Sequence, residues 1–156
     1  MKLRIGALLL LSLFILGGCS FSGDKTYQEL SAEIEDMGFN CPIPKKTPKD
    51  NGETEVTTIN GDKVLRVMYY AEEGYPLLHI ECFDEESLKI WENIINSNPE
   101  DFVVTEWKDK TIYTSKNLYH ERVVSVLDAE KNFMSVSVNV VEEDEVVDYV
   151  IDNILK

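Results

Sequence analysis

Apolar and polar residues alternate along several short segments of this sequence, and a period of two is typical of half-buried β-strands. The clearest case is segment 133–141, in which apolar residues alternate with Ser135, Ser137 and Asn139. One face of this strand is therefore expected to be buried and the other to contact water. Six other segments have a similar composition. The seven expected strands are therefore 54–59, 63–70, 77–83, 102–107, 111–115, 122–128 and 133–141.

A hydrophobic period near 3.6 residues predicts three helices, at 26–38, 85–97 and 142–155. Thr26 and Glu29 have the spacing of a capping box at the start of the first helix, and Gly38 is suited to its end. The other two helices begin with acidic residues, which interact favourably with the positive end of the helix dipole.

The turns and the order of these elements indicate the fold class. Asn60 and Gly61 separate two strands, and this dipeptide favours the positive φ angles of a hairpin turn. We expect a single α+β domain over 26–156, with a twisted antiparallel sheet of about six to seven strands and helices packed mainly on one face. Segments 81–95 and 138–155 share a plan of strand, acidic cap and helix, which indicates either a degenerate two-fold repeat or only the general need to cover a sheet.

The amino end of the chain has a different pattern. Lys2 and Arg4 precede the uncharged run 5–18, which has the length of a secretory signal core and is short for a membrane-spanning helix. The boundary between this run and the polar region is Leu16-Gly17-Gly18-Cys19. It resembles the lipobox of bacterial lipoproteins, with a mild departure at Gly17, where Ala or Ser is usual.

This resemblance implies both an address and an anchor. In lipoproteins a diacylglycerol is joined to the cysteine sulfur and the leader is cut just before it, so residues 1–18 would be removed and Cys19 would be the mature N-terminus. Two acyl chains hold a protein stably at a membrane. The expected location is the extracytoplasmic face of the cell membrane, with residues 19–25 as a lipidated tether. The alternatives are an ordinary signal peptide with an incidental Cys19, or a membrane helix.

Net charge narrows the classes of partner. The formal charge of the whole chain is −14, and loss of Lys2 and Arg4 with the leader makes it −16. Nucleic-acid binding needs clustered basic residues, so no nucleic-acid partner is expected. Such a charge favours cationic or basic partners, and it also has a simpler role in keeping the protein soluble.

The cysteine content fits an oxidising location. The sequence has three cysteines, and assignment of Cys19 to lipid leaves Cys41 and Cys82. A disulfide between these two residues would close a loop of about 40 residues and stabilise the fold by about 3–4 kcal/mol. The alternative is two buried free thiols, and the sequence does not decide between them.

Motifs for catalysis and metal binding are weak. The sequence has two histidines, His79 and His120, and the dipeptide His120-Glu121 lacks the second histidine of a zinc-protease helix. Acidic clusters at 84–86 and 142–145 are explained by helix capping. We therefore expect no cofactor and no metal, and enzyme activity is not favoured.

Aromatic residues give a positive indication of function. Tyr and Trp provide large contact area at low entropic cost, although cross-strand packing is the alternative role for them. The candidate surface residues are Tyr69, Tyr70, Tyr75, Trp107, Tyr113 and Tyr119. We expect a non-enzymatic binding module for a protein, a peptide or an envelope component.

Two other classes of function remain open from the sequence. One is an extracytoplasmic hydrolase that uses carboxylates or the residues His79 and His120. The other is a lipoprotein that binds a small solute or a metal, although a mature chain of this length is small for a two-lobed solute receptor. Neither the ligand nor the oligomeric state is indicated by the sequence.

Substitution Cys19→Ala tests the anchor directly. Without the thiol there is no site for the diacylglycerol, so we expect the variant to shift from the membrane fraction to the soluble fraction or to accumulate with its leader uncut. Fractionation followed by mass spectrometry of the amino-terminal peptide measures both outcomes. A Cys19→Ala protein with the leader removed and unchanged membrane retention would contradict the lipobox interpretation.

Overall fold

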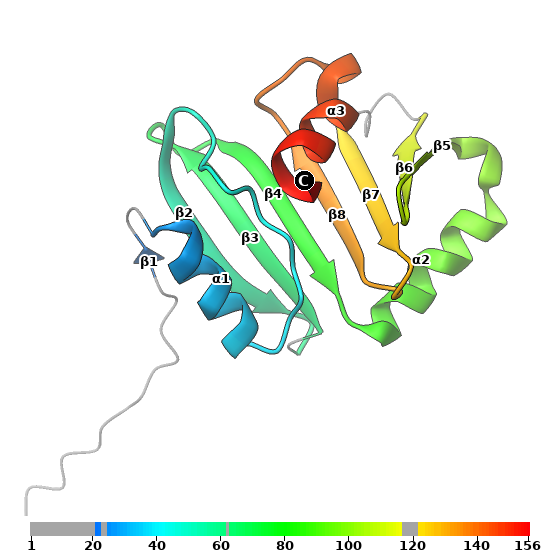
Figure 1. Cartoon of the computed structure of the whole chain (residues 1–156), viewed down its shortest axis with the longest axis horizontal. Helices are drawn as coiled ribbons and strands as arrows, with labels where there is room; N and C mark the ends of the chain where they lie inside the picture. The colour runs from blue at the N-terminus through cyan, green and yellow to red at the C-terminus, as the bar shows by residue number, and fades with distance from the viewer. Residues whose placement is uncertain (1–20, 23–24, 62, 117–121) are drawn as a thin grey trace, which may run out of the picture.

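The computed structural model describes residues 21–22, 25–61, 63–116 and 122–156 (Figure 1). These residues form one antiparallel sheet with the strand order β1-β2-β3-β4-β8-β7-β6-β5. Three α-helices pack on the sheet, so the predicted α+β class is confirmed. Strand β1 has only two residues, which leaves seven longer strands, in agreement with the number predicted.

The strands agree closely with the alternating segments of the sequence. Their bounds are β1 Phe21–Ser22, β2 Asn51–Ile59, β3 Val64–Ala71, β4 Pro76–Phe83, β5 Phe102–Trp107, β6 Lys110–Ser115, β7 Val123–Asp128 and β8 Phe133–Val138. The helices are α1 Tyr27–Asp36, α2 Glu85–Ser97 and α3 Val146–Val150. Helix α3 follows a 3₁₀ turn at Glu143–Glu145 and continues as a π-helical turn at Ile151–Leu155, and another 3₁₀ turn lies at Pro99–Asp101.

The local signals at the turns act as the sequence indicates. The Thr26 hydroxyl accepts a hydrogen bond from the Glu29 backbone N–H, and the Glu29 carboxylate accepts one from the Thr26 backbone N–H at 2.8 Å, which completes the capping box of α1. Gly38, just beyond this helix, has a φ of 84°. Asn60 and Gly61 both have positive φ, 55° and 67°, and the flanking residues of β2 and β3 are paired.

The hydrophobic core lies on one side of the sheet, which we call the first face. Side chains such as Val67, Ile80 and Val136 point to this side and are completely buried. Helix α1 contributes Leu30 and Ile34 to the same cluster. Helix α3 and its π-helical continuation contribute Val146, Val150 and Ile154. Burial of these residues is the main source of stability.

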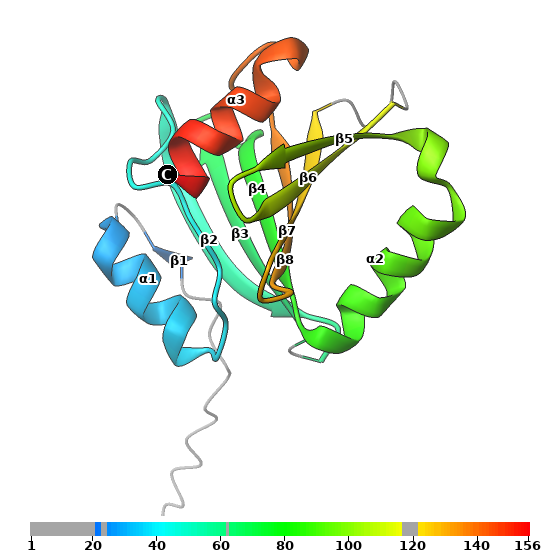
Figure 2. The same cartoon turned by 45° about the vertical axis from the view of Figure 1, so that its right-hand side comes forward.

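The three helices do not all cover this first face. Helices α1 and α3 lie on it, which agrees with the prediction that the helices pack mainly on one face, whereas α2 lies against the other side (Figure 2). Trp91 of α2 contacts Phe83 and Phe133, whose neighbours Cys82 and Met134 belong to the core of the first face. An amphipathic stripe predicts that a helix is half-buried but not which side of a sheet it covers.

The strand order places the last strand of each half of the chain at the centre of the sheet, where β4 pairs with β8. Helices α2 and α3, which follow these two strands, pack on opposite faces. Two-fold rotation about an axis normal to the sheet would place them on the same face. The degenerate repeat is therefore not confirmed.

The amino end falls mostly outside the described residues. The predicted leader 1–18 and Cys19 lie outside them, as do Tyr119 and His120. Segment 19–25 was expected to be only a tether, but Phe21–Ser22 pairs with β2 at Thr54 and Glu55. Within the described part of the chain, no helix is long and apolar enough to cross a membrane.

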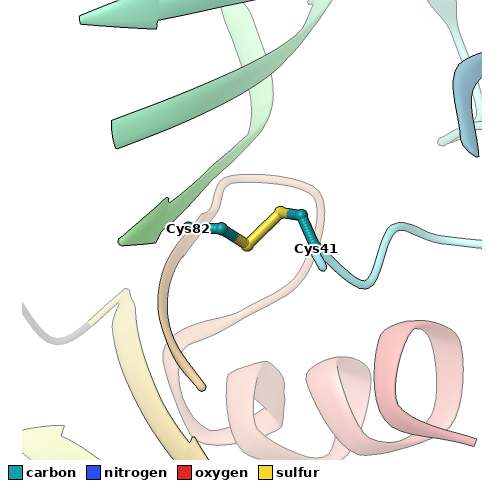
Figure 3. The surroundings of a disulfide bond; sticks show 2 residues. All are labelled: Cys41 and Cys82. Atoms are coloured by element: carbon teal, nitrogen blue, oxygen red, sulfur yellow. A yellow bond between two sulfur atoms is a disulfide. The ribbon is translucent and has the colours of Figure 1, made fainter. Parts of the chain in front are cut away.

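A disulfide links the loop after α1 to the centre of the sheet (Figure 3). Cys41 and Cys82 have an S–S distance of 2.03 Å and a Cα–Cα distance of 5.7 Å. Cys41 follows the turn at Gly38, and Cys82 lies on the first face of β4, so the bond holds the connection between α1 and β2 against the core.

We expect the double substitution Cys41→Ala with Cys82→Ala to lower the free energy of unfolding by about 3–4 kcal/mol. Loss of the cross-link frees a loop whose ends are 41 residues apart in the unfolded state. Urea denaturation of the two proteins measures the difference. Reductant should destabilise the wild-type protein and leave the variant unchanged, and equal sensitivity of both would contradict the stabilising role.

A candidate binding site on the second face of the sheet

The second face is the side of the sheet that points away from α1 and α3. Strand register aligns its side chains in rows that run across the sheet. One row consists of Tyr113, Ser125, Ser135, Glu81 and Arg66, each directly opposite the next. It joins an aromatic residue on β6 to a charged pair on β3 and β4 through two serines, and adjacent strands are about 4.8 Å apart.

The rows on either side of this one have different chemistry. Towards the start of α2, the row consists of Leu127, Phe133, Phe83, Val64 and Ile59. Its apolar character explains why α2 packs over this part of the sheet. On the opposite side, the row consists of Val123, Ser137, His79, Met68 and Glu55, which are all partly exposed.

Helix α2 is held on the second face by an aromatic cluster. The ring of Trp91 lies 6.1 Å from that of Phe83 in an edge-on arrangement and 5.6 Å from that of Phe133. The rings of Phe83 and Phe133 are 5.3 Å apart. Such aromatic pairs add to the stabilisation from burial, and together with buried Leu88 they fix the position of α2.

A cavity of about 170 Å³ lies at the margin between α2 and strands β5 to β7. Its lining residues are Trp91, Phe102, Tyr113, Ser115, Val123 and Ser125. The rings of Phe102 and Tyr113 are 6.4 Å apart and nearly perpendicular, at 86°. A mostly apolar lining with a few hydroxyl groups has the composition of a ligand site, and the small volume fits a single chemical group rather than a whole drug-sized molecule.

The carboxylate of Glu81 is the centre of a charged group on the same face. Its Oε1 accepts hydrogen bonds from Arg66 Nε at 3.0 Å and Arg66 Nη2 at 2.6 Å, and it lies 3.2 Å from His79 Nε2. These partners lower the pKa of Glu81, with the bond to His79 as the largest cause. Nearby, the Tyr70 hydroxyl donates to Glu55 at 3.5 Å, and burial raises the pKa of Tyr70.

The geometry around His79 does not form a hydrolytic triad. Ser137 is directly opposite His79, but the hydrogen bonds of the described residues join His79 to Glu81 and not to this serine. His79 does not line the aromatic cavity or the neighbouring cavities in the described part of the chain. In the same described part of the chain, no group of three or more His, Cys, Asp or Glu residues could hold a metal ion.

The structure divides the aromatic residues that were expected to form one surface. Tyr70 and Tyr113 lie on the second face, and Tyr75 is exposed at the turn between β3 and β4. Tyr69 is completely buried in the core, and burial strongly raises the pKa of its hydroxyl. Trp107 packs against the core of the first face, with Lys108 Nζ 4.2 Å from its ring centre. The prediction of a surface position is therefore wrong for Tyr69, and partly exposed Trp107 lies on the other face of the sheet from Tyr70 and Tyr113.

Two residues of the cavity were missed at the level of sequence. Trp91 belongs to the apolar stripe of a helix, and such residues are usually core residues. Phe102 begins an edge strand, where nothing in the sequence distinguishes it from other strand residues. Trp91 and Phe102 come together only when the chain folds and both lie beside Tyr113.

A larger cleft of about 500 Å³ lies near the disulfide, between the end of α1, the start of α2 and the β7–β8 turn. Two of its polar residues, Asp84 and Asn132, have structural partners. In that turn the Asp128 carboxylate accepts hydrogen bonds from the backbone N–H groups of Glu130 and Asn132, and Asp84 accepts one from Ser87 at the start of α2. Asp84 and Asn132 therefore stabilise a helix end and a turn, and the aromatic cavity, which gathers three rings, is the better candidate site.

Comparisons with protein-family models, curated proteins and solved structures find no match for this chain. The assignment of a site therefore depends on geometry alone. The second face combines an aromatic cavity, a strip of serines and the Arg66–Glu81–His79 group. This arrangement can bind a ligand by ring contacts and hydrogen bonds.

Substitution Glu81→Gln tests the charged group on this face. The lowered pKa means that ionised Glu81 stabilises the fold above the unfolded-state pKa of about 4.3, and that this contribution is lost as the pH falls through the lower folded-state value. We expect the free energy of unfolding of Glu81→Gln to be about 1 kcal/mol below that of the wild type at pH 7, a modest difference because the bond is only partly shielded from water. The difference should shrink as the pH falls, because the wild-type carboxylate becomes protonated.

Urea denaturation between neutral and acidic pH measures this difference. Glu73→Gln, at an exposed carboxylate in the β3–β4 turn, is the matched control and should follow the wild-type profile. If wild type and Glu81→Gln lost stability in parallel with falling pH, the ionised Glu81 would have no stabilising role.

Proposed function

We propose that this chain is a lipid-anchored, extracytoplasmic lipoprotein that acts as a non-enzymatic binding module. Its ligand would be a protein, a peptide or another component of the cell envelope, and it would bind on the second face of the sheet. The lipobox resemblance at Leu16–Cys19 supports the location.

The aromatic cavity is the observation that carries this proposal. Trp91, Phe102 and Tyr113 come from three different elements and line one hollow, yet each ring remains partly exposed. Partly exposed aromatic side chains in a cavity are typical of binding sites, because they offer apolar contact area that is already held in place.

The neighbouring strip supports a binding role in a second way. Ser135 and Ser137 are small and partly exposed, and they lie on β8 between buried Ser125 of β7 and the side chains of β4. Beyond them lie His79 and the Arg66–Glu81 pair, which can make polar contacts with a larger ligand. A binding module needs such a combination of apolar anchor and polar rim.

Site-specific photocrosslinking tests the proposal in cells that carry the anchored protein. Benzoylphenylalanine at Tyr70 or Tyr113 samples the second face, and the same residue at exposed Tyr27 of α1 is the matched control. We expect a discrete crosslinked product from positions 70 and 113 that is absent from position 27. Mass spectrometry of that product identifies the partner.

The crosslinked product should disappear when Trp91→Ala is added to the same chain, since the ring forms a wall of the cavity. Circular dichroism checks that this variant is folded. Equal crosslinking from positions 27, 70 and 113, or a product that survives Trp91→Ala, would reject the second face as the binding surface.

A further inference from the structure

The walls of the aromatic cavity are arranged around a common space. Phe102 and Tyr113 meet nearly at right angles, at 86°, and Trp91 forms a further wall from α2. The position of Trp91 is fixed from behind by Phe83 and Phe133. Three rings from α2, β5 and β6 therefore line a space whose shape does not depend on a single flexible loop.

The chemistry of this space selects the type of ligand. An aromatic face carries a negative electrostatic potential, so a cation close to the ring centres is attracted by each ring. Besides the Tyr113 hydroxyl and the Trp91 indole N–H, the polar side chains in the lining are Ser115 and Ser125, and the lining includes no basic residue. Nothing in it would neutralise an anion.

Carboxylates lie close to the same rings. Glu92 and Tyr113 together line an adjoining cavity of about 120 Å³. Glu106 lies on the same side of β5 as the cavity, where its carboxylate accepts a hydrogen bond from Thr111 at 3.2 Å. Burial raises the pKa of Tyr113, and the two carboxylates raise it further. This negative surrounding favours a positive ligand.

The nearest basic residue along β6 does not reverse this charge pattern. Lys116 follows Ser115, and its Nζ donates a hydrogen bond to the Glu100 carbonyl oxygen at 2.7 Å. It is exposed and is not one of the residues that line the cavity.

We infer that the cavity between Trp91, Phe102 and Tyr113 binds a substituted ammonium group, with Glu92 and Glu106 supplying the opposite charge. This inference rests on the proposed function, because it names the ligand chemistry of the second face. A cavity of about 170 Å³ suits a compact head group such as trimethylammonium.

Choline and its uncharged carbon isostere, dimethylbutanol, provide the direct test. Titration of the full chain in the Trp107→Phe background is followed by the fluorescence of Trp91 and by calorimetry, so the optical signal reports on the cavity. We expect choline to bind roughly ten-fold more tightly than dimethylbutanol, because only choline carries the charge that the rings attract. Equal affinity would overturn the inference and leave an unselective apolar cavity.

Matched variants assign the effect to individual side chains. Tyr113→Phe keeps the ring and should bind choline as the wild type does, whereas Tyr113→Leu and Phe102→Leu should weaken binding several-fold. Glu92→Gln should also weaken choline binding but leave dimethylbutanol unaffected, and Glu130→Gln in the β7–β8 turn is the control for charge. Weak binding by Tyr113→Phe, or the same loss from Glu130→Gln as from Glu92→Gln, would contradict the assignment.

Two sources of the ammonium group are separated by vesicles. Retention on phosphatidylcholine vesicles, but not on phosphatidylglycerol vesicles, would indicate a lipid head group, and binding of free choline alone would indicate a solute. Absence of binding to choline, tetramethylammonium and phosphatidylcholine vesicles would overturn the inference. The crosslinks from positions 70 and 113 are independent of this result, so the proposed function would survive it.

Discussion

The burial of the first face of the sheet is the constraint on which the rest of the structure depends. Alternation along the strands sends Val67, Ile80 and Val136 to one side, and burial of these apolar side chains requires the cover that α1 and α3 provide. The disulfide holds the connection after α1 against the same core. Because every second strand residue packs into this core, the intervening residues can be serine, histidine or charged, and these residues form the second face.

The second face is covered only in part, and this asymmetry produces the candidate site. Helix α2 needs an apolar surface, and it finds one in the row that contains Phe83 and Phe133. It cannot cover the whole face, since the next rows are polar. The cavity lies at the margin of the helix, where Trp91 extends towards Tyr113 and Phe102. The same arrangement of rings therefore stabilises α2 and shapes the site.

Much of the fold can be predicted from the sequence, because period and capping are local properties. The seven longer strands, the capping box at Thr26 and the turn at Asn60 all follow from residues near one another in the chain. The face of the sheet under α2 and the approach of Cys41 to Cys82 depend on distances that no local pattern contains. The candidate site shares this difficulty. Tyr69 and Tyr70 are adjacent residues of the same type, yet alternation along the strand buries the first and leaves the second partly exposed.

The short strand β1 has a consequence for how the molecule would stand on a membrane. Phe21 pairs with Glu55 at one margin of the sheet. One residue separates Phe21 from Cys19, so a lipid on Cys19 would be attached close to that margin. Six strand spacings separate β1 from β6, a span of roughly 30 Å. The hollow beside Tyr113 would therefore lie near the margin of the sheet opposite to the anchored one, where ligands in the aqueous phase could reach it.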